Sequence, residues 1–108
     1  MLKKVFLCLP MDAEQEEVLL YVRYALTTAH APVVPNFYLK SVNQSSEGEE
    51  LVLSAGRSLI WFCDEFWICG SRITPQMQSQ IELCKHLSIR TRTLTEQAVR
   101  KKLGGISQ

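Results

Sequence analysis

The sequence of 108 residues lacks the motifs that mark the common cofactor and metal sites. It contains no Gly-x-Gly-x-x-Gly segment and no Gly-Lys-Ser phosphate loop, so neither a dinucleotide site nor a P-loop site is expected. Its four cysteines, which are Cys8, Cys63, Cys69 and Cys84, do not have the short spacing of a zinc site. We therefore expect reduced core cysteines in a cytoplasmic protein, with no bound metal and no cofactor.

The sequence also has no large excess of positive or of negative residues, and it has no long apolar run. The 12 lysines and arginines face 11 aspartates and glutamates, for a net charge of +1, so the sequence predicts no nucleic-acid partner. Residues 90–102 hold a basic cluster, which fits a solvated C-terminal helix. No segment approaches the roughly 18 apolar residues that span a bilayer, and the apolar run near the N-terminus is too short for a signal peptide. We expect no membrane partner.

What the sequence does contain is an alternation of strand-like and helix-like segments. Residues 3–9 and 65–69 are continuous apolar runs, which are typical of strands covered on both faces in a parallel sheet. A short strand is predicted at residues 33–34. A more polar one is predicted at residues 89–93, and we expect it at an edge of the sheet. Residues 36–46 form an unusually long loop between a strand and a helix, and such loops often cover sites.

Apolar residues with helical spacing fill the intervals between these strands. The first helix is expected to begin after an Asp12 cap and to end near His30, because Pro32 disfavours helix in the residue before it. The second helix is expected to begin at Ser45 or Ser46. Its buried stripe is expected to consist of Leu51, Ala55, Leu59 and Phe62.

The third and fourth helices have clearer start signals. Thr74 caps the third helix and Pro75 takes its first position, where a missing N–H costs nothing. Thr95 caps the last helix, which we expect to run over residues 96–103 and to stop at Gly104. The inner stripe of the third helix is expected to consist of Met77, Ile81 and Cys84.

Strands that alternate with helices imply a parallel sheet with right-handed crossovers. We predict an α/β fold of the flavodoxin or Rossmann-like kind. This is a three-layer α/β/α sandwich whose four-stranded parallel sheet has the order 2-1-3-4. Residues 1–103 would form a single domain, and residues 104–108 a flexible C-terminal tail.

In such a fold, ligands bind at the carboxyl ends of the strands, at the switch point between the first and third strands. Gly70 allows the backbone to turn sharply there, and Arg72 can hold a phosphate or carboxylate at two points. The start of the third helix offers free N–H groups. Turn formation and capping alone would also explain Gly70 and Thr74. We predict a ligand site that consists of Pro10, Met11, Asn36, Gly70, Ser71, Arg72, Thr74, Gln76, Met77 and Gln80.

Several segments together resemble a known family. They are Val5–Pro10, Ala31–Pro35, Cys63–Gly70, Ile73–Met77 and Ile81–Leu83. Their order and spacing resemble the small nucleoside 2-deoxyribosyltransferase-like proteins, many of them phage or mobile-element proteins of unknown function. The resemblance extends over about residues 3–93, and Cys-Asp-Glu-x-Trp-x-x-Gly is its most specific part. It implies the fold predicted above, a nucleotide or nucleoside-like ligand, and a homo-oligomer.

The resemblance also implies that the family's catalytic groups are replaced. The transferases attack the sugar with a glutamate of the third helix, and that position falls on Gln80, whose amide cannot form a glycosyl ester. The family's helix-start glycine falls on Gln76, its aspartate on Thr74, and the histidine after its second strand on Asn36. Asp12 and Gln80 remain as catalytic candidates, and the substitutions speak against an enzyme.

Three functions therefore stay open. The first is a domain that binds a nucleotide or nucleoside-like molecule without glycosyl transfer, with Gln76 and Gln80 either as hydrogen-bonding groups or as plain surface residues. The second is an active N-glycosidase or deoxyribosyltransferase with a rearranged site that uses Asp12 or Glu82. The third is a structural protein that self-associates through Trp61, unless that tryptophan lies over its own core.

Overall fold

Four parallel strands form the centre of the molecule, in the order β2-β1-β3-β4. The computed structural model describes residues 1–42 and 45–106. The strands are β1 (Lys3–Cys8), β2 (His30–Val33), β3 (Glu65–Cys69) and β4 (Arg90–Leu94). The helices are α1 (Gln15–Thr27), the 3-10 helix η1 (Pro35–Ser41), α2 (Ser46–Ile60), α3 (Pro75–His86) and α4 (Glu96–Ile106). The predicted α/β fold and the predicted sheet order are both confirmed.

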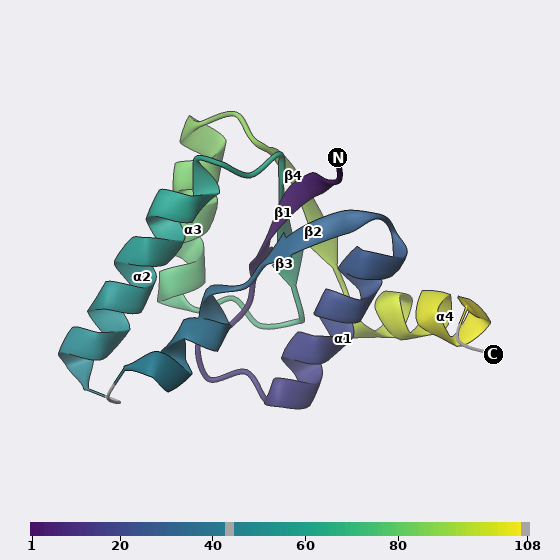
Figure 1. Ribbon diagram of the computed structural model, residues 1–108, viewed down its shortest axis with the longest axis horizontal. Coiled ribbons are helices and arrows are strands. Elements are labelled where there is room, and N and C mark those ends of the chain that lie inside the picture. The colour runs from purple at the N-terminus through teal and green to yellow at the C-terminus, as the bar shows by residue number, and fades with distance from the viewer. Residues whose placement is uncertain (43–44, 107–108) are drawn as a thin grey trace.

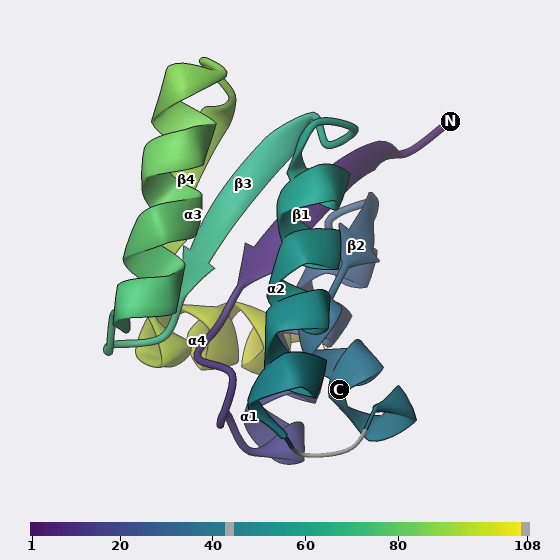
Figure 2. The same ribbon diagram turned by 90° about the vertical axis from the view of Figure 1, so that its left-hand side faces the viewer.

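Helices cover both faces of the sheet, which makes the three layers that the sequence predicts. Figures 1 and 2 show α2 and α3 on one face, and α1 and α4 on the other. Because successive side chains of a strand point to opposite faces, each central strand contributes to two cores. Leu7 and Trp67 pack toward α1 and α4. Phe6 and Phe66 stack with ring centroids 5.3 Å apart on the side of α2 and α3.

The structure corrects the limits of the first helix and the second strand. The N-cap of α1 is Glu14, whose side chain makes no capping hydrogen bond, so the prediction of an Asp12 cap is wrong. Ala29 takes a positive φ of 61° after the helix, and His30 already belongs to β2. Pro32 lies within β2, which is possible because β2 is an edge strand and its missing N–H can face outward.

The buried side of α2 also differs from the prediction. Leu51 and Phe62 are 66% and 71% exposed, so the predicted stripe is wrong at both ends. The buried residues of the helix are Gly48, Val52, Gly56 and Ile60. Gly56 lets the helix approach η1 closely, because a Cβ atom there would lie 3.3 Å from Cγ of Pro35. The buried side of α2 therefore carries Gly56 against η1, whereas Leu51 lies on the exposed side.

The C-terminal half follows the sequence more closely. The Thr74 cap is confirmed, since its Oγ1 accepts a hydrogen bond from the backbone N–H of Met77 at 3.2 Å. The inner stripe of α3 is buried as predicted, and β4 is an edge strand with mostly exposed side chains. The helix α4 continues past Gly104 to Ile106, so the predicted stop is wrong, and residues 107–108 of the predicted tail lie outside the described residues. None of the described helices combines the length and apolar character needed to cross a membrane.

Candidate functional site

The loops after β1 and β3 meet at the carboxyl edge of the sheet, as the predicted switch point requires. Nη2 of Arg72 donates a hydrogen bond to Oδ1 of Asp12 at 2.6 Å, although both side chains are exposed. This hydrogen bond lowers the pKa of Asp12 below its usual value of 3.8. Asp12 is therefore a partner of Arg72 and not a helix cap, and the charge of Arg72 is already balanced.

Asn36 joins the end of β2 to the same edge. Its Nδ2 donates to the carbonyl oxygen of Pro10 at 2.8 Å, and the backbone N–H of Ala13 donates to that oxygen at 3.0 Å. Oδ1 is the acceptor end of the same side-chain amide, and Asn36 also belongs to the walls of the first hollow described below. A backbone carbonyl thus holds the Asn36 amide in place, while ligand binding by Pro10 and Asn36 stays a prediction.

Two adjacent hollows lie between the loop after β1, the helix η1 and the start of α2. The first has a volume of about 200 Å³, and its walls are Met11, Ala13, Gln15, Val18, Asn36, Phe37 and Leu39. The second has a volume of about 220 Å³, and its walls are Met11, Asp12, Leu39 and Glu49. Met11 and Leu39 belong to both, so a ligand that displaces either side chain would meet one larger space. Mostly apolar walls with a few polar atoms are typical of small-molecule sites.

Gln80 is buried, with an exposed fraction of 5%, so the interpretation of it as a surface residue is wrong. Its Oε1 accepts a hydrogen bond from Sγ of Cys8 at 3.3 Å. Its Nε2 lies 3.6 Å from the position that a Cβ atom of Gly56 would take. Gln80 therefore fills the core between β1 and α2, whereas Gln76, one turn earlier, is exposed.

The remaining predicted site residues do not line either hollow. Gly70 takes a positive φ of 93° and turns the chain after β3, which is a conformation that glycine adopts freely. Ser71 and Gln76 are exposed, Thr74 caps α3, and Met77 lies in the core. Gly70, Thr74 and Met77 thus have structural roles, and ligand binding by this half of the predicted site stays a prediction.

Most of the walls that η1 and α2 supply were not predicted from the sequence. Phe37 and Leu39 belong to residues 36–46, which were expected to be a loop and contain η1 instead. The unusual length of that segment was the available signal. Glu49 lies in the first turn of α2, where an acidic residue is favourable in any helix and so indicates no site. None of these positions belongs to a sequence motif, because the residues that line a hollow come from segments that only folding brings together.

The residues that the structure describes offer neither a metal centre nor an activated thiol. Within residues 1–42 and 45–106, no three His, Cys, Asp or Glu side chains come together as a metal site would require. The four cysteines are buried and form no disulfide. Burial raises the pKa of Cys8 to about 12 and that of Cys63 to about 11, so neither supplies a thiolate near neutral pH.

Comparison with known proteins agrees with the fold. The family of a domain of unknown function, DUF7768, matches residues 3–94. No curated protein matches the sequence. Among solved structures, a 2-deoxyribosyltransferase from the psychrotolerant bacterium Bacillus psychrosaccharolyticus is similar, with a TM-score of 0.70. The likeness covers 85% of this chain and 72% of that chain at 13% sequence identity, which establishes a shared fold alone.

Proposed function

We propose that this chain, which belongs to the DUF7768 family of domains of unknown function, binds a nucleoside in the two hollows around Met11 and does not transfer its sugar. One observation carries the proposal. The chain has the fold of a 2-deoxyribosyltransferase, but the position that the resemblance assigns to the nucleophile holds Gln80, which is buried and bonded to Cys8. An amide in the core is not a nucleophile, whereas the hollows around Met11 can still accept a ligand.

The walls of the hollows suit the two parts of a nucleoside. Met11, Val18 and Leu39 offer apolar surface for the faces of a base. Oδ1 of Asn36 and the carboxylates of Asp12 and Glu49 can accept hydrogen bonds from sugar hydroxyls or from exocyclic amines.

The charges around the hollows favour a nucleoside over a nucleotide. The carboxylates of Asp12 and Glu49 flank the second hollow and would repel a phosphate. Arg72 could balance such a phosphate, but it is held by Asp12 at 2.6 Å. A phosphate that approached Arg72 would meet the Asp12 carboxylate beside it and would compete with that carboxylate for the guanidinium.

Thermal unfolding in the presence of nucleosides and nucleotides tests the proposal. At a nucleoside concentration tenfold above Kd, binding adds about 1.4 kcal/mol to the free energy of unfolding, which raises Tm by several degrees in a domain of this size. We expect this rise with at least one nucleoside and a smaller rise with its 5′-monophosphate. Absence of stabilisation by every nucleoside at millimolar concentration would overturn the proposal.

A variant that fills the first hollow locates the binding. Ala13→Phe places an aromatic ring in a space of about 200 Å³ and should abolish the rise in Tm. Ala98→Phe is the matched control, because Ala98 is exposed on α4 and lines neither hollow. Equal stabilisation of both variants by the nucleoside would place the ligand elsewhere.

Chromatography of the same mixtures tests catalysis separately. We expect no release of free base from a deoxynucleoside by the wild-type protein, because Gln80 cannot form the covalent intermediate. If the wild-type protein releases free base and Asp12→Asn does not, the chain is instead an enzyme with a rearranged site. This result would hold whether or not the nucleoside raises Tm.

A further inference from the structure

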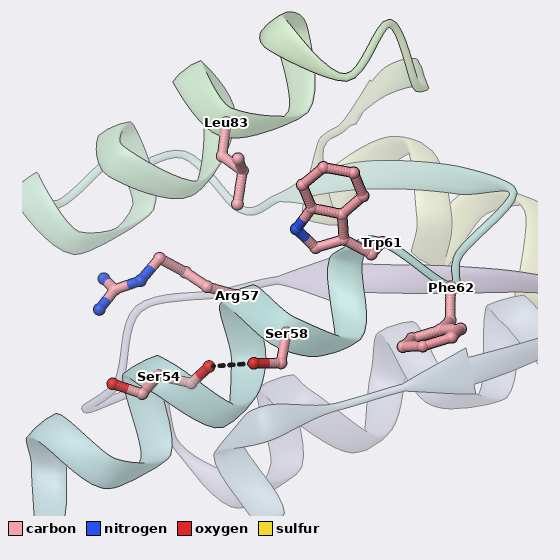
Figure 3. A pocket seen from close by; sticks show the side chains of 6 residues that line it. All are labelled: Ser54, Arg57, Ser58, Trp61, Phe62 and Leu83. Carbon is pink, nitrogen blue, oxygen red and sulfur yellow. Dashed lines mark hydrogen bonds between the residues drawn. The ribbon is translucent and has the colours of Figure 1, made fainter.

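The outer side of α2 is a part of the surface that the nucleoside site leaves unused. Leu51 and Trp61 are 66% and 65% exposed there. A hollow of about 680 Å³ lies along the same side, and its walls are Ser54, Arg57, Ser58, Trp61, Phe62 and Leu83. Figure 3 shows Trp61 on the side of α2 near α3, with Leu83 pointing from α3 into the space between the helices.

The residues of this side form one continuous line. Glu47, Ser54 and Trp61 follow one another at intervals of two helical turns, and Val52 and Gly56 lie on the opposite, buried side. We call this line the α2 stripe and define it as Glu47, Glu50, Leu51, Ser54, Arg57, Ser58 and Trp61. The stripe has an apolar residue near each end and two serines between them.

The charges of the α2 stripe are segregated along its length. Glu47 and Glu50 lie in the first half of the helix, and Arg57 lies in the second half. Nη2 of Arg57 reaches Oε1 of Glu50 on the same helix at 3.7 Å, with both side chains still substantially exposed. Two copies of the stripe therefore attract each other when antiparallel and repel each other when parallel. The small side chain of Ser54 allows two helix backbones to approach closely at the middle.

We infer that the α2 stripe binds the α2 stripe of a second copy of this chain, antiparallel, around a two-fold axis at Ser54. Arg57 of one copy then faces Glu50 of the other. Trp61 packs beside Glu47 of the other copy, whose carboxylate can accept a hydrogen bond from the indole N–H. Trp61 is 65% exposed, and the pairing gives its N–H a protein acceptor while it covers Leu51 and Trp61. The inference does not depend on the nucleoside site.

The expected dimer is reversible. A stable interface buries about 800 Å² on each partner, and a single pair of helices buries less than that. Sedimentation velocity between about 1 µM and about 500 µM, which covers the Kd range of such interfaces, should show a monomer that converts to a dimer. Trp61→Glu should remain monomeric, and Ile73→Glu, at an apolar side chain 55% exposed outside the stripe, should dimerise like the wild type. A monomer of the wild type over the whole range would overturn the inference.

Charge exchange tests the antiparallel geometry. Arg57→Glu and Glu50→Lys should each raise the dimer Kd by about tenfold or more, because each brings like charges together in its own dimer. An equimolar mixture of the two variants should dimerise again, since both facing pairs then become opposite in charge. Circular dichroism of each variant confirms that it is folded. If both variants dimerise with the Kd of the wild type, the antiparallel geometry is wrong. It is also wrong if the mixture dimerises no more tightly than each variant alone.

A crosslink tests the axis without changing a charge. Ser54→Cys should form a disulfide-linked dimer on mild oxidation, because the two copies of residue 54 face each other. The four native cysteines are buried and contribute little background. Gln97→Cys, at an exposed position of α4, is the control and should crosslink far more slowly. Equal rates for both variants would contradict the assigned axis.

Discussion

Oε1 of Glu65 accepts a hydrogen bond from the indole Nε1 of Trp67 at 3.0 Å, and both side chains are buried. The second carboxylate oxygen lies 3.4 Å from Nε2 of His30 and 4.0 Å from Nζ of Lys3. Glu65 is the first residue of β3, so this cluster lies at the amino end of the sheet, opposite the candidate site. Burial alone would raise the pKa of Glu65, but the hydrogen bonds from Trp67 and His30 and the nearby basic groups hold the pKa below 4.5.

Glu65→Gln should lower the free energy of unfolding by about 1–3 kcal/mol at pH 7, because a charged acceptor is replaced by a neutral one among buried donors. The lowered pKa of Glu65 means that its carboxylate stabilises the fold above pH 4.5 and loses that contribution as pH falls through the folded-state pKa. The difference in free energy of unfolding between the wild type and Glu65→Gln should therefore shrink below pH 4.5. Urea unfolding between about pH 3 and pH 7 measures it.

Glu82→Gln is the control for this profile, since Glu82 is exposed on α3. It should leave the free energy of unfolding nearly unchanged at every pH. A difference between wild type and Glu65→Gln that stays constant down to pH 3 would contradict the role assigned to the carboxylate.

The architecture could be predicted because it rests on long-range patterns. A continuous apolar run predicts β3, and alternation of strands with helices predicts the parallel sheet and its order. The cap at Thr74 could be predicted because capping is local, involving one hydroxyl and one backbone N–H three residues away.

The details that the sequence analysis missed all depend on contacts between distant segments. Gly56 is buried because Pro35 of η1 lies against it, and apolar periodicity gives no weight to a glycine. Gln80 is buried because Cys8 supplies a hydrogen-bond donor across the core. Asp12 does not cap α1 and pairs instead with Arg72, sixty residues away. Nothing within a window of ten or fifteen residues contains these partners.

The hydrogen bond from Arg72 should be visible in the titration of Asp12. Carbon NMR of the Asp12 carboxyl should give a pKa below 3.8 in the wild type. Arg72→Gln should raise that pKa toward 3.8, because the main cause of the lowered pKa is removed. Both side chains are exposed, so the melting temperature should change little and the pKa difference should fall with added salt. An unchanged Asp12 pKa in Arg72→Gln would show that the pair is not formed in solution.

Gly56→Val should destabilise the protein by about 2 kcal/mol or more, because a branched side chain has no room between α2 and η1. A single Cβ atom already lies 3.3 Å from Cγ of Pro35 and 3.6 Å from Nε2 of Gln80. Ser79→Val, at an exposed site on α3, adds the same branched side chain without that contact and should cost only the difference in helix propensity. Equal losses in the two variants, measured by urea unfolding, would mean that the contact between α2 and η1 does not constrain residue 56.

Gln80→Glu restores the residue type that the transferase resemblance expects, and it should harm the protein rather than activate it. The new carboxyl would lie in the core beside Cys8, whose thiol stays protonated because burial raises its pKa to about 12. With no cation beside it among the described core residues, the carboxylate form should lower the free energy of unfolding by about 2–4 kcal/mol near pH 7.

The stability lost in Gln80→Glu should increase with pH. Burial raises the pKa of such a carboxyl in the folded state, so the protonated form is tolerated and the destabilisation grows as pH rises through that value. Gln76→Glu, exposed in the first turn of the same helix, is the control and should be neutral or slightly stabilising because negative charge there complements the helix dipole. If Gln80→Glu instead kept full stability at pH 8 and released free base from a deoxynucleoside, position 80 would face substrate. The chain would then be a transferase that lacks only its carboxylate.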